Sequence, residues 1–178
     1  MNVTDTTSLP AIHLSEAAPV LWAIGNSDRL AAEFRFGDQL RNYHWQNDVP
    51  ANLTYTVGQS SPAQDWYYAQ TNPGSWNVNY IDRADGSGRV LNVAFAAASN
   101  RGMTNPTTPS LSVLVNGTKV KDIRYDNDKS VYRGALTSGK YHYERISIDS
   151  SLLRDGANII TFTLNGGTFM YDVMTLTK

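Results

Sequence analysis

The sequence predicts an all-β protein, built as a sandwich or a barrel of short strands. Apolar residues recur at every second position, as in Leu91, Val93 and Phe95, and this period is typical of strands with one buried face. Turn-forming pairs, of which Asn116-Gly117 is the strongest, separate these segments. Short strands between such turns build sandwiches and barrels rather than parallel sheets.

We expect about eight to ten strands, with helix limited to single turns at 27–32 and 150–154. Trp76 alternates with Val78 and Tyr80 on an apolar side, so we expect it in the core. The inward positions of the main segments predict a core of Leu91, Val93, Phe95, Val113, Val115, Ile146, Ile148, Ile160 and Phe162.

Length and composition fit one domain of ordinary size. The chain has 178 residues, of which 41% are hydrophobic and 17% charged. Residues 1–19 are polar and broken by Pro10 and Pro19, so we interpret them as a linker or N-terminal arm. The segment 20–178 then forms the folded domain, which is long enough to bury about 70% of its unfolded surface.

The charge, the apolar segments and the cysteine content of the chain disfavour several classes of protein. The net charge of −1 lacks the basic excess of a nucleic-acid-binding protein. No apolar run is long enough to span a bilayer, and the first residues do not have the pattern of an export signal. The absence of cysteine excludes disulfides and thiolate metal sites. We expect no nucleic acid or membrane partner, and a monomer.

The segment 141–148 carries the best candidate binding face. If Ile146 and Ile148 point inward, alternation places Tyr141, Tyr143 and Arg145 together on the outward face. Tyrosine rings stack on sugar rings, and a guanidinium can bind a uronate carboxylate through two hydrogen bonds. The alternative is that tyrosine simply favours strands and that the arginine is solvated.

Aromatic residues also follow one another in Trp66-Tyr67-Tyr68. They form either a packed corner of the core or a platform for a sugar, since indole is common in both places. Trp66 or Tyr67 is therefore a candidate flanking platform for the outward row. For catalysis the sequence offers little, because nothing resembles a nucleophile elbow and no histidine pair has zinc spacing.

Five segments carry a resemblance to a known family. They are Leu21–Phe34, Arg41–Trp45, Tyr55–Gln70, Ser151–Asn158 and Met170–Val173. Together they resemble the carboxy-terminal module, domain III, of the family 4 polysaccharide lyases, the rhamnogalacturonan lyases. The resemblance implies a jelly-roll sandwich of the galactose-binding-like type. It covers only this accessory module, because the catalytic module with its lysine and histidine has no counterpart here.

The resemblance adds two further expectations. Tyr132-Arg133-Gly134 falls where such modules have a glycine-containing loop, which places Arg133 near one end of the binding face. Jelly-roll carbohydrate modules also often hold a structural calcium ion between acidic residues of the first and last strands. Glu33 and Asp172 occupy similar positions and are our candidate ligands. A buried salt bridge of Asp172 with Arg29 or Arg41 is the alternative.

Three functions compete. The leading hypothesis is a non-catalytic carbohydrate-binding module that targets a pectic, rhamnogalacturonan-like polysaccharide and is excised from a larger secreted lyase. The second is a lyase that is active on its own. The third is a structural spacer without any ligand.

Overall fold

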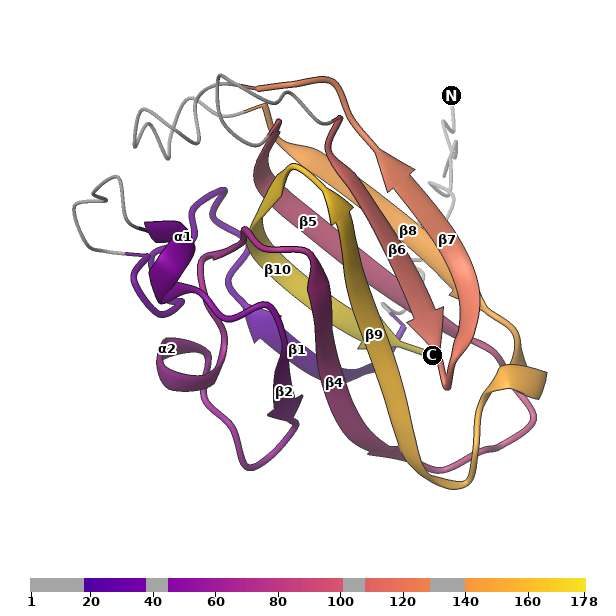
Figure 1. Ribbon diagram of the computed structural model, residues 1–178. Coiled ribbons are helices and arrows are strands. Elements are labelled where there is room, and N and C mark those ends of the chain that lie inside the picture. Colours follow the sequence, from indigo (N-terminus) through magenta and orange to yellow (C-terminus); the bar gives the residue numbers. More distant parts are fainter. Residues whose placement is uncertain (1–17, 38–44, 101–107, 129–139) are drawn as a thin grey trace, which may run out of the picture.

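The protein is a sandwich of two sheets that lie face to face (Figure 1). The computed structural model describes residues 18–37, 45–100, 108–128 and 140–178. Its strands are β1 (Val20–Gly25), β2 (Leu53–Thr56), β3 (Ala69–Gln70), β4 (Gly74–Asp82), β5 (Arg89–Ser99), β6 (Ser110–Val115), β7 (Thr118–Arg124), β8 (His142–Ile148), β9 (Gly156–Gly166) and β10 (Thr168–Thr177).

Strand pairing divides these elements into two five-stranded sheets. Sheet one has the order β1-β10-β5-β8, and β3 also pairs with β10. Sheet two has the order β2-β4-β9-β6-β7, in which β2 runs parallel to β4 and the remaining pairs are antiparallel. The all-β class that alternation predicted is confirmed, and of its two alternatives, sandwich or barrel, the protein has the sandwich that the resemblance implied.

Helix is limited to short turns, but they do not all lie where we expected them. The helices are α1 (Trp45–Asp48), α2 (Pro62–Asp65) and a 3-10 turn, η2 (Ser150–Leu152). Only η2 matches an expected turn; residues 27–32 form turns and bends without a helix. The prediction of a helical turn there was wrong. The Asp28 side chain accepts a hydrogen bond from the Leu30 N–H at 2.8 Å, and this Asx turn takes the place of a helical turn. No helix in the described ranges is long and apolar enough to cross a membrane.

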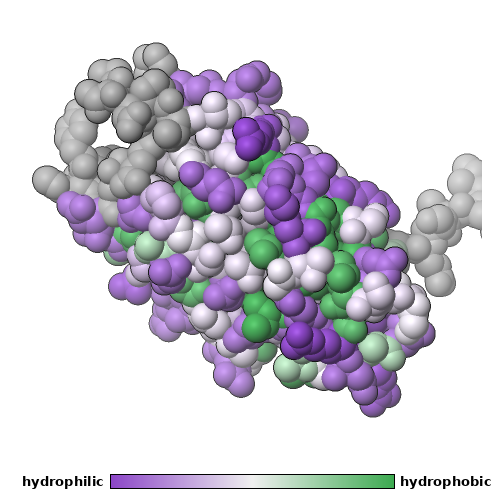
Figure 2. Space-filling model, turned by 45° about the vertical axis from the view of Figure 1, so that its right-hand side comes forward, coloured by the Kyte–Doolittle hydropathy of each residue, from purple (hydrophilic) through white to green (hydrophobic). Residues whose placement is uncertain are grey.

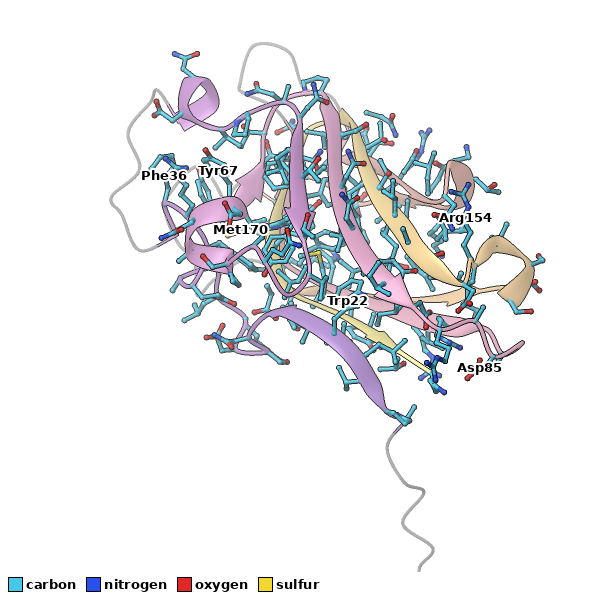
Figure 3. All side chains as sticks on the ribbon, turned by 90° about the horizontal axis from the view of Figure 1, so that it is seen from below. Trp22, Phe36, Tyr67, Asp85, Arg154 and Met170 are labelled. Carbon is cyan, nitrogen blue, oxygen red and sulfur yellow. The ribbon has the colours of Figure 1, made fainter. Side chains whose placement is uncertain are left out.

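The core lies between the sheets and contains an aromatic cluster. All nine predicted core residues are buried, and Trp76 stacks on Tyr171 with ring centroids 5.7 Å apart. Trp66 packs edge-on against both rings, at 5.0 Å and 5.2 Å. In Figure 3, Trp22 of β1 faces the other sheet, where its ring lies 5.8 Å from that of Tyr80 on β4, while Phe36 and Tyr67 lie together near the short helices. Interlocking rings of this kind fix the spacing of the sheets. Figure 2 shows the hydrophilic and apolar side chains that alternate over one outer face of the molecule.

A buried arginine joins the loop after β4 to the start of β5. The Arg89 guanidinium binds both oxygens of Asp82, at 2.9 and 3.0 Å, and one oxygen of Asp85 at 3.1 Å. Asp85 also binds Lys178, whose backbone N–H donates to the Pro19 carbonyl at 3.1 Å. This network holds the two ends of the described domain together, at the Asp85 end of Figure 3.

A stacked pair packs where the edge strands of the two sheets come together. The rings of Tyr125 and His142 are parallel, with centroids 3.7 Å apart. The Tyr125 hydroxyl donates to Glu144 at 2.7 Å, and Nε2 of His142 is buried without a partner among the described residues. Burial, more than the charge of Lys140, holds the pKa of His142 below its ordinary value.

Replacing Arg89 with leucine should destabilise the domain by about 3 kcal/mol, because it leaves the Asp82 carboxylate buried without a counter-charge. The measurement is the free energy of unfolding in urea. Asp85, the exposed partner of Arg89, offers a matched control. Asp85→Asn removes only a solvent-exposed ion pair and should change the free energy of unfolding little. Equal effects of the two substitutions would contradict this account.

Replacing His142 with phenylalanine should flatten the dependence of the melting temperature on pH. When folding lowers the pKa of a histidine, the folded state is favoured at pH values above the unfolded-state pKa of about 6.5. This contribution to the free energy of unfolding is lost as the pH falls toward the folded-state pKa. Phenylalanine keeps the ring against Tyr125 and removes the titration. Melting curves between about pH 7 and pH 5 test this; an unchanged slope would exclude His142 as the source.

Candidate functional site

The outer face of β8 has the arrangement that alternation predicted. Ile146 and Ile148 are buried, whereas Tyr143 and Arg145 are exposed. Tyr143 is 58% exposed and is the one aromatic ring among the exposed large apolar side chains of the described residues. The described residues give the Arg145 side chain no hydrogen bond, ion pair or ring contact. An accessible ring therefore lies beside a guanidinium that no described residue binds.

Both tyrosines of this face lie down across β5 rather than standing out from the sheet. The Tyr143 hydroxyl donates to Oδ1 of Asn92 at 2.7 Å, and the Tyr141 hydroxyl donates to Oδ2 of Asp172 on β10 at 2.8 Å. Ala94 is the direct cross-strand partner of Tyr143, yet it is only 1% exposed. The tethered ring of Tyr143 accounts for this burial.

Asp172 is placed by an irregularity in β10. The register of β10 on β5 passes from Tyr171 to Val173 and leaves Asp172 unpaired, as in a β-bulge. Its carboxylate accepts hydrogen bonds from the backbone N–H groups of Asp28, at 3.4 Å, and Arg29. The bulge therefore fastens the loop after β1 to the outer face of sheet one.

A glycine lets this loop approach β10 closely. A Cβ at Gly25 would lie 2.1 Å from the backbone oxygen of Asp172 and 2.7 Å from the Phe34 ring, and the φ angle of Gly25 is +89°. Only glycine fits such a position without strain. The close approach brings Glu33 beside Asp172, where Glu33 accepts from the Asn26 N–H.

Burial dominates the electrostatics of this corner. It raises the pKa of both Asp172 and Glu33 above the ordinary carboxyl range, against the hydrogen bonds that lower it. Burial, followed by the hydrogen bond to Asp172, raises the pKa of Tyr141 to about 12. Tyr141 thus keeps its proton at neutral pH and remains a donor to Asp172.

Arg29 flanks Tyr141 in a geometry that the sequence did not indicate. Its guanidinium carbon lies 5.2 Å from the centroid of the Tyr141 ring, a cation-π distance. Its φ of 66° is in the left-handed region that non-glycine residues seldom adopt. The alternative of an Arg29–Asp172 salt bridge is not what the described contacts give, because only the Arg29 backbone binds Asp172; Arg41 lies outside the described residues.

The two predicted aromatic platform residues, Trp66 and Tyr67, do not join this face. Trp66 is 0% exposed and packs in the core, which corrects its expected role as a sugar platform: an enclosed ring offers no face to a ligand. Tyr67 is half-buried, with ring contacts to Phe36 and Trp76 and the Arg35 guanidinium 5.1 Å from its centroid. Arg133 lies outside the described residues.

The predicted calcium ligands Glu33 and Asp172 do lie near each other. Oε2 of Glu33 is buried without a donor among the described residues, so an oxygen-preferring cation would suit it. The Asp172 carboxylate, in contrast, accepts hydrogen bonds from N–H and O–H donors. No cluster of three or more metal-ligating side chains occurs in the described ranges. The chemistry of the pair fits a cation in part, and calcium stays a prediction.

Comparison with known proteins identifies close relatives. A rhamnogalacturonate lyase of Dickeya dadantii is 50% identical over 173 residues, which are 97% of this chain and 30% of that relative. A probable rhamnogalacturonate lyase B of Aspergillus fumigatus is 31% identical over 84 residues, 36% of this chain and 13% of the relative. The chain thus spans less than a third of the curated relatives that it matches. Among solved structures, a family 35 carbohydrate binding module from an environmental isolate has a TM-score of 0.43 at 13% identity, covering 92% of this chain and 90% of that one.

The family model described as CBM-like, polysaccharide lyase family 4, domain III matches residues 20–176. This confirms the resemblance in the sequence, and with it the expectation of an accessory module rather than a catalytic one. The chain belongs to the family of carbohydrate-binding-module-like third domains of polysaccharide lyase family 4.

Proposed function

We propose that this module binds an acidic, rhamnogalacturonan-like polysaccharide of the plant cell wall through the outer face of sheet one. The observation that carries the proposal is the exposed ring of Tyr143, tethered to Asn92 by its hydroxyl, beside the guanidinium of Arg145, which has no partner among the described residues. The relatives are named as rhamnogalacturonate lyases, which supports this class of polymer. Such a module acts outside the cell, as a monomer, within a longer secreted lyase.

Tyr143 offers the stacking surface. One side of its ring covers Ala94, and the hydroxyl is tethered to Asn92, so the other side faces solvent in a fixed orientation. A ring that is already held loses little conformational freedom when a sugar packs on it, which favours binding. Stacking by itself is neutral toward the charge of the sugar.

Arg145 supplies the preference for acidic sugars. A guanidinium presents paired N–H groups that match a carboxylate, and Arg145 has no carboxylate of its own among the described residues. Arg29, whose guanidinium carbon lies 5.2 Å from the Tyr141 ring centroid, adds a second cation near this face. A uronate-bearing chain is therefore favoured over a neutral one.

Binding of this kind would serve a parent enzyme by tethering. Single stacking and charge contacts give modest affinity, in the micromolar to millimolar range or roughly −4 to −8 kcal/mol. A tether converts that affinity into a high effective concentration of catalytic module at the polymer. A spacer without a ligand is the competing function, and retention of the domain by the polymer distinguishes the two.

Tyr143→Ala and Arg145→Gln should each weaken retention by rhamnogalacturonan in affinity electrophoresis about tenfold, with little change in melting temperature, since both side chains are exposed. The Arg145 effect should shrink as salt is added and should vanish with the carboxyl-reduced polymer. Arg154→Gln, an exposed arginine after η2 (Figure 3), is the matched control and should bind normally. Unchanged retention in both test variants would favour the spacer.

We further propose one structural calcium ion at Glu33 and Asp172. The support is that Oε2 of Glu33 is buried without a partner among the described residues and lies beside the buried carboxylate of Asp172. The raised pKa of each group indicates that burial opposes its ionisation, and a bound cation would offset that cost. Binding to the folded state alone would stabilise it by mass action.

Calcium should then raise the melting temperature of the wild-type domain above its value in chelator. Asp172→Asn should abolish this response. A carboxyl whose pKa is raised on folding loses stability as pH rises through the ordinary carboxyl range toward the folded value, so in chelator at neutral pH Asp172→Asn should be no less stable than wild type. Identical wild-type melting with calcium and with chelator would exclude the ion.

A further inference from the structure

The outer face of sheet one contains a row of side chains that runs across the strands, perpendicular to the β8 row. Arg145 on β8 is directly opposite Asn92 on β5, and Asn92 is directly opposite Thr175 on β10. Thr175 is in turn opposite Ala23 on β1. We call these four residues the cross-strand row. It spans three inter-strand spacings, or about 14 Å.

Hydrogen bonds link the middle of this row to Tyr143. The Tyr143 hydroxyl donates to Oδ1 of Asn92 at 2.7 Å, and Nδ2 of Asn92 donates to Oγ1 of Thr175 at 3.3 Å. Each bond joins neighbouring strands, so three strands share one chain of polar groups. Such linked groups polarise one another and hold their orientation.

The linked groups keep hydrogen-bonding capacity for a ligand. Asn92 uses one of its two N–H donors and one lone pair of its oxygen in these bonds, and the Thr175 hydroxyl is used only as an acceptor. An N–H of Asn92 and the O–H of Thr175 therefore remain to donate. Both residues are only partly buried, so these donors are within reach of solvent and of a sugar hydroxyl.

Among the described residues, small side chains border most of the row on its Tyr143 side. The cross-strand positions next to Tyr143 are Ala94, Val173 and Gly25, and the fourth residue of the row is the exposed Ala23. Along β8, by contrast, the direction toward its start is closed by Tyr141, which is tied down to Asp172 with Arg29 stacked on it. The open direction is across the sheet.

We propose that the glycan lies across the strands along the cross-strand row, with Asn92 and Thr175 as further ligand-binding residues. A uronate carboxylate binds Arg145 at the β8 end, a sugar ring stacks on Tyr143, and the next sugar unit accepts hydrogen bonds from Asn92 and Thr175 toward β1. This inference rests on the proposed function and revises the direction in which the sequence placed the ligand, which was along β8.

The test compares two isosteric or nearly isosteric changes on the same face. Thr175→Val removes a hydroxyl from the cross-strand row, and Ser147→Ala removes one from β8, two positions beyond Arg145. We expect Thr175→Val to weaken binding of rhamnogalacturonan oligosaccharides about threefold to tenfold by titration calorimetry, the effect of one hydrogen bond. Ser147→Ala should leave the affinity unchanged. Thr163→Val, on the outer face of sheet two, controls for losing a threonine hydroxyl.

Charge gives a second readout in the same row. Asn92→Asp keeps an acceptor for the Tyr143 hydroxyl but places a negative charge beside the proposed uronate, so binding should weaken more at low salt than at high salt. The carboxyl-reduced oligosaccharide should be less affected. Melting temperatures verify that each variant is folded.

The outcomes separate this inference from the proposed function. If Tyr143→Ala and Arg145→Gln weaken binding but Thr175→Val does not, the cross-strand orientation is wrong and the face is right. A loss with Ser147→Ala in place of Thr175→Val would put the glycan along β8. If none of the variants on this face weakens binding, the proposed function of the face fails as well.

Discussion

The register of β8 against β5 is the constraint on which the outer face of sheet one depends. Ile148 is opposite Arg89 and Ile146 is opposite Leu91, and burial of the two isoleucines opposes a slip. A shift by one residue would turn Tyr143 and Arg145 into the core and expose the isoleucines. Since β8 is an edge strand of its sheet, this hydrophobic preference, rather than pairing on both sides, keeps the site in place.

The bulge at Asp172 is the second device that builds the site. Without the bulge, Asp172 would be an ordinary paired residue of β10, between the buried Tyr171 and the half-buried Val173. The unpaired residue instead directs a carboxylate toward the loop after β1, where it accepts from two backbone N–H groups and from Tyr141. A single irregularity therefore orders a loop and fixes a ring, which is a common use of bulges next to functional sites.

Periodicity predicted which side chains of a single strand are buried and which are exposed. It did not predict the features that depend on how separate strands pair and pack. The outward positions of Tyr143 and Arg145 could be read from the sequence because Ile146 and Ile148 fix the phase of the same strand. Trp66 is one of three consecutive aromatics, which have no period of their own, and its burial depends on contacts with Trp76 and Tyr171 from distant strands. Asn92 and Thr175 could not be connected from the sequence at all, because they are 83 positions apart. Their proximity depends on the strand order of sheet one and on register shifts between β10 and β5, and bulged residues break the count that alternation relies on.

The tethered side chains affect how the proposed face would bind a sugar. Tyr141 and Tyr143 are held by their hydroxyls, and Asn92 is held from both sides, so binding has few rotamers left to order. The cost of ordering the protein side of the proposed face would therefore be small. The remaining costs would be the lost motional freedom of the sugar and the desolvation of polar groups on both partners. A flat and open surface would make few contacts per sugar unit, so we expect a modest affinity and rapid release of each stretch of polymer. That combination would suit the proposed role of tethering a parent enzyme to its substrate.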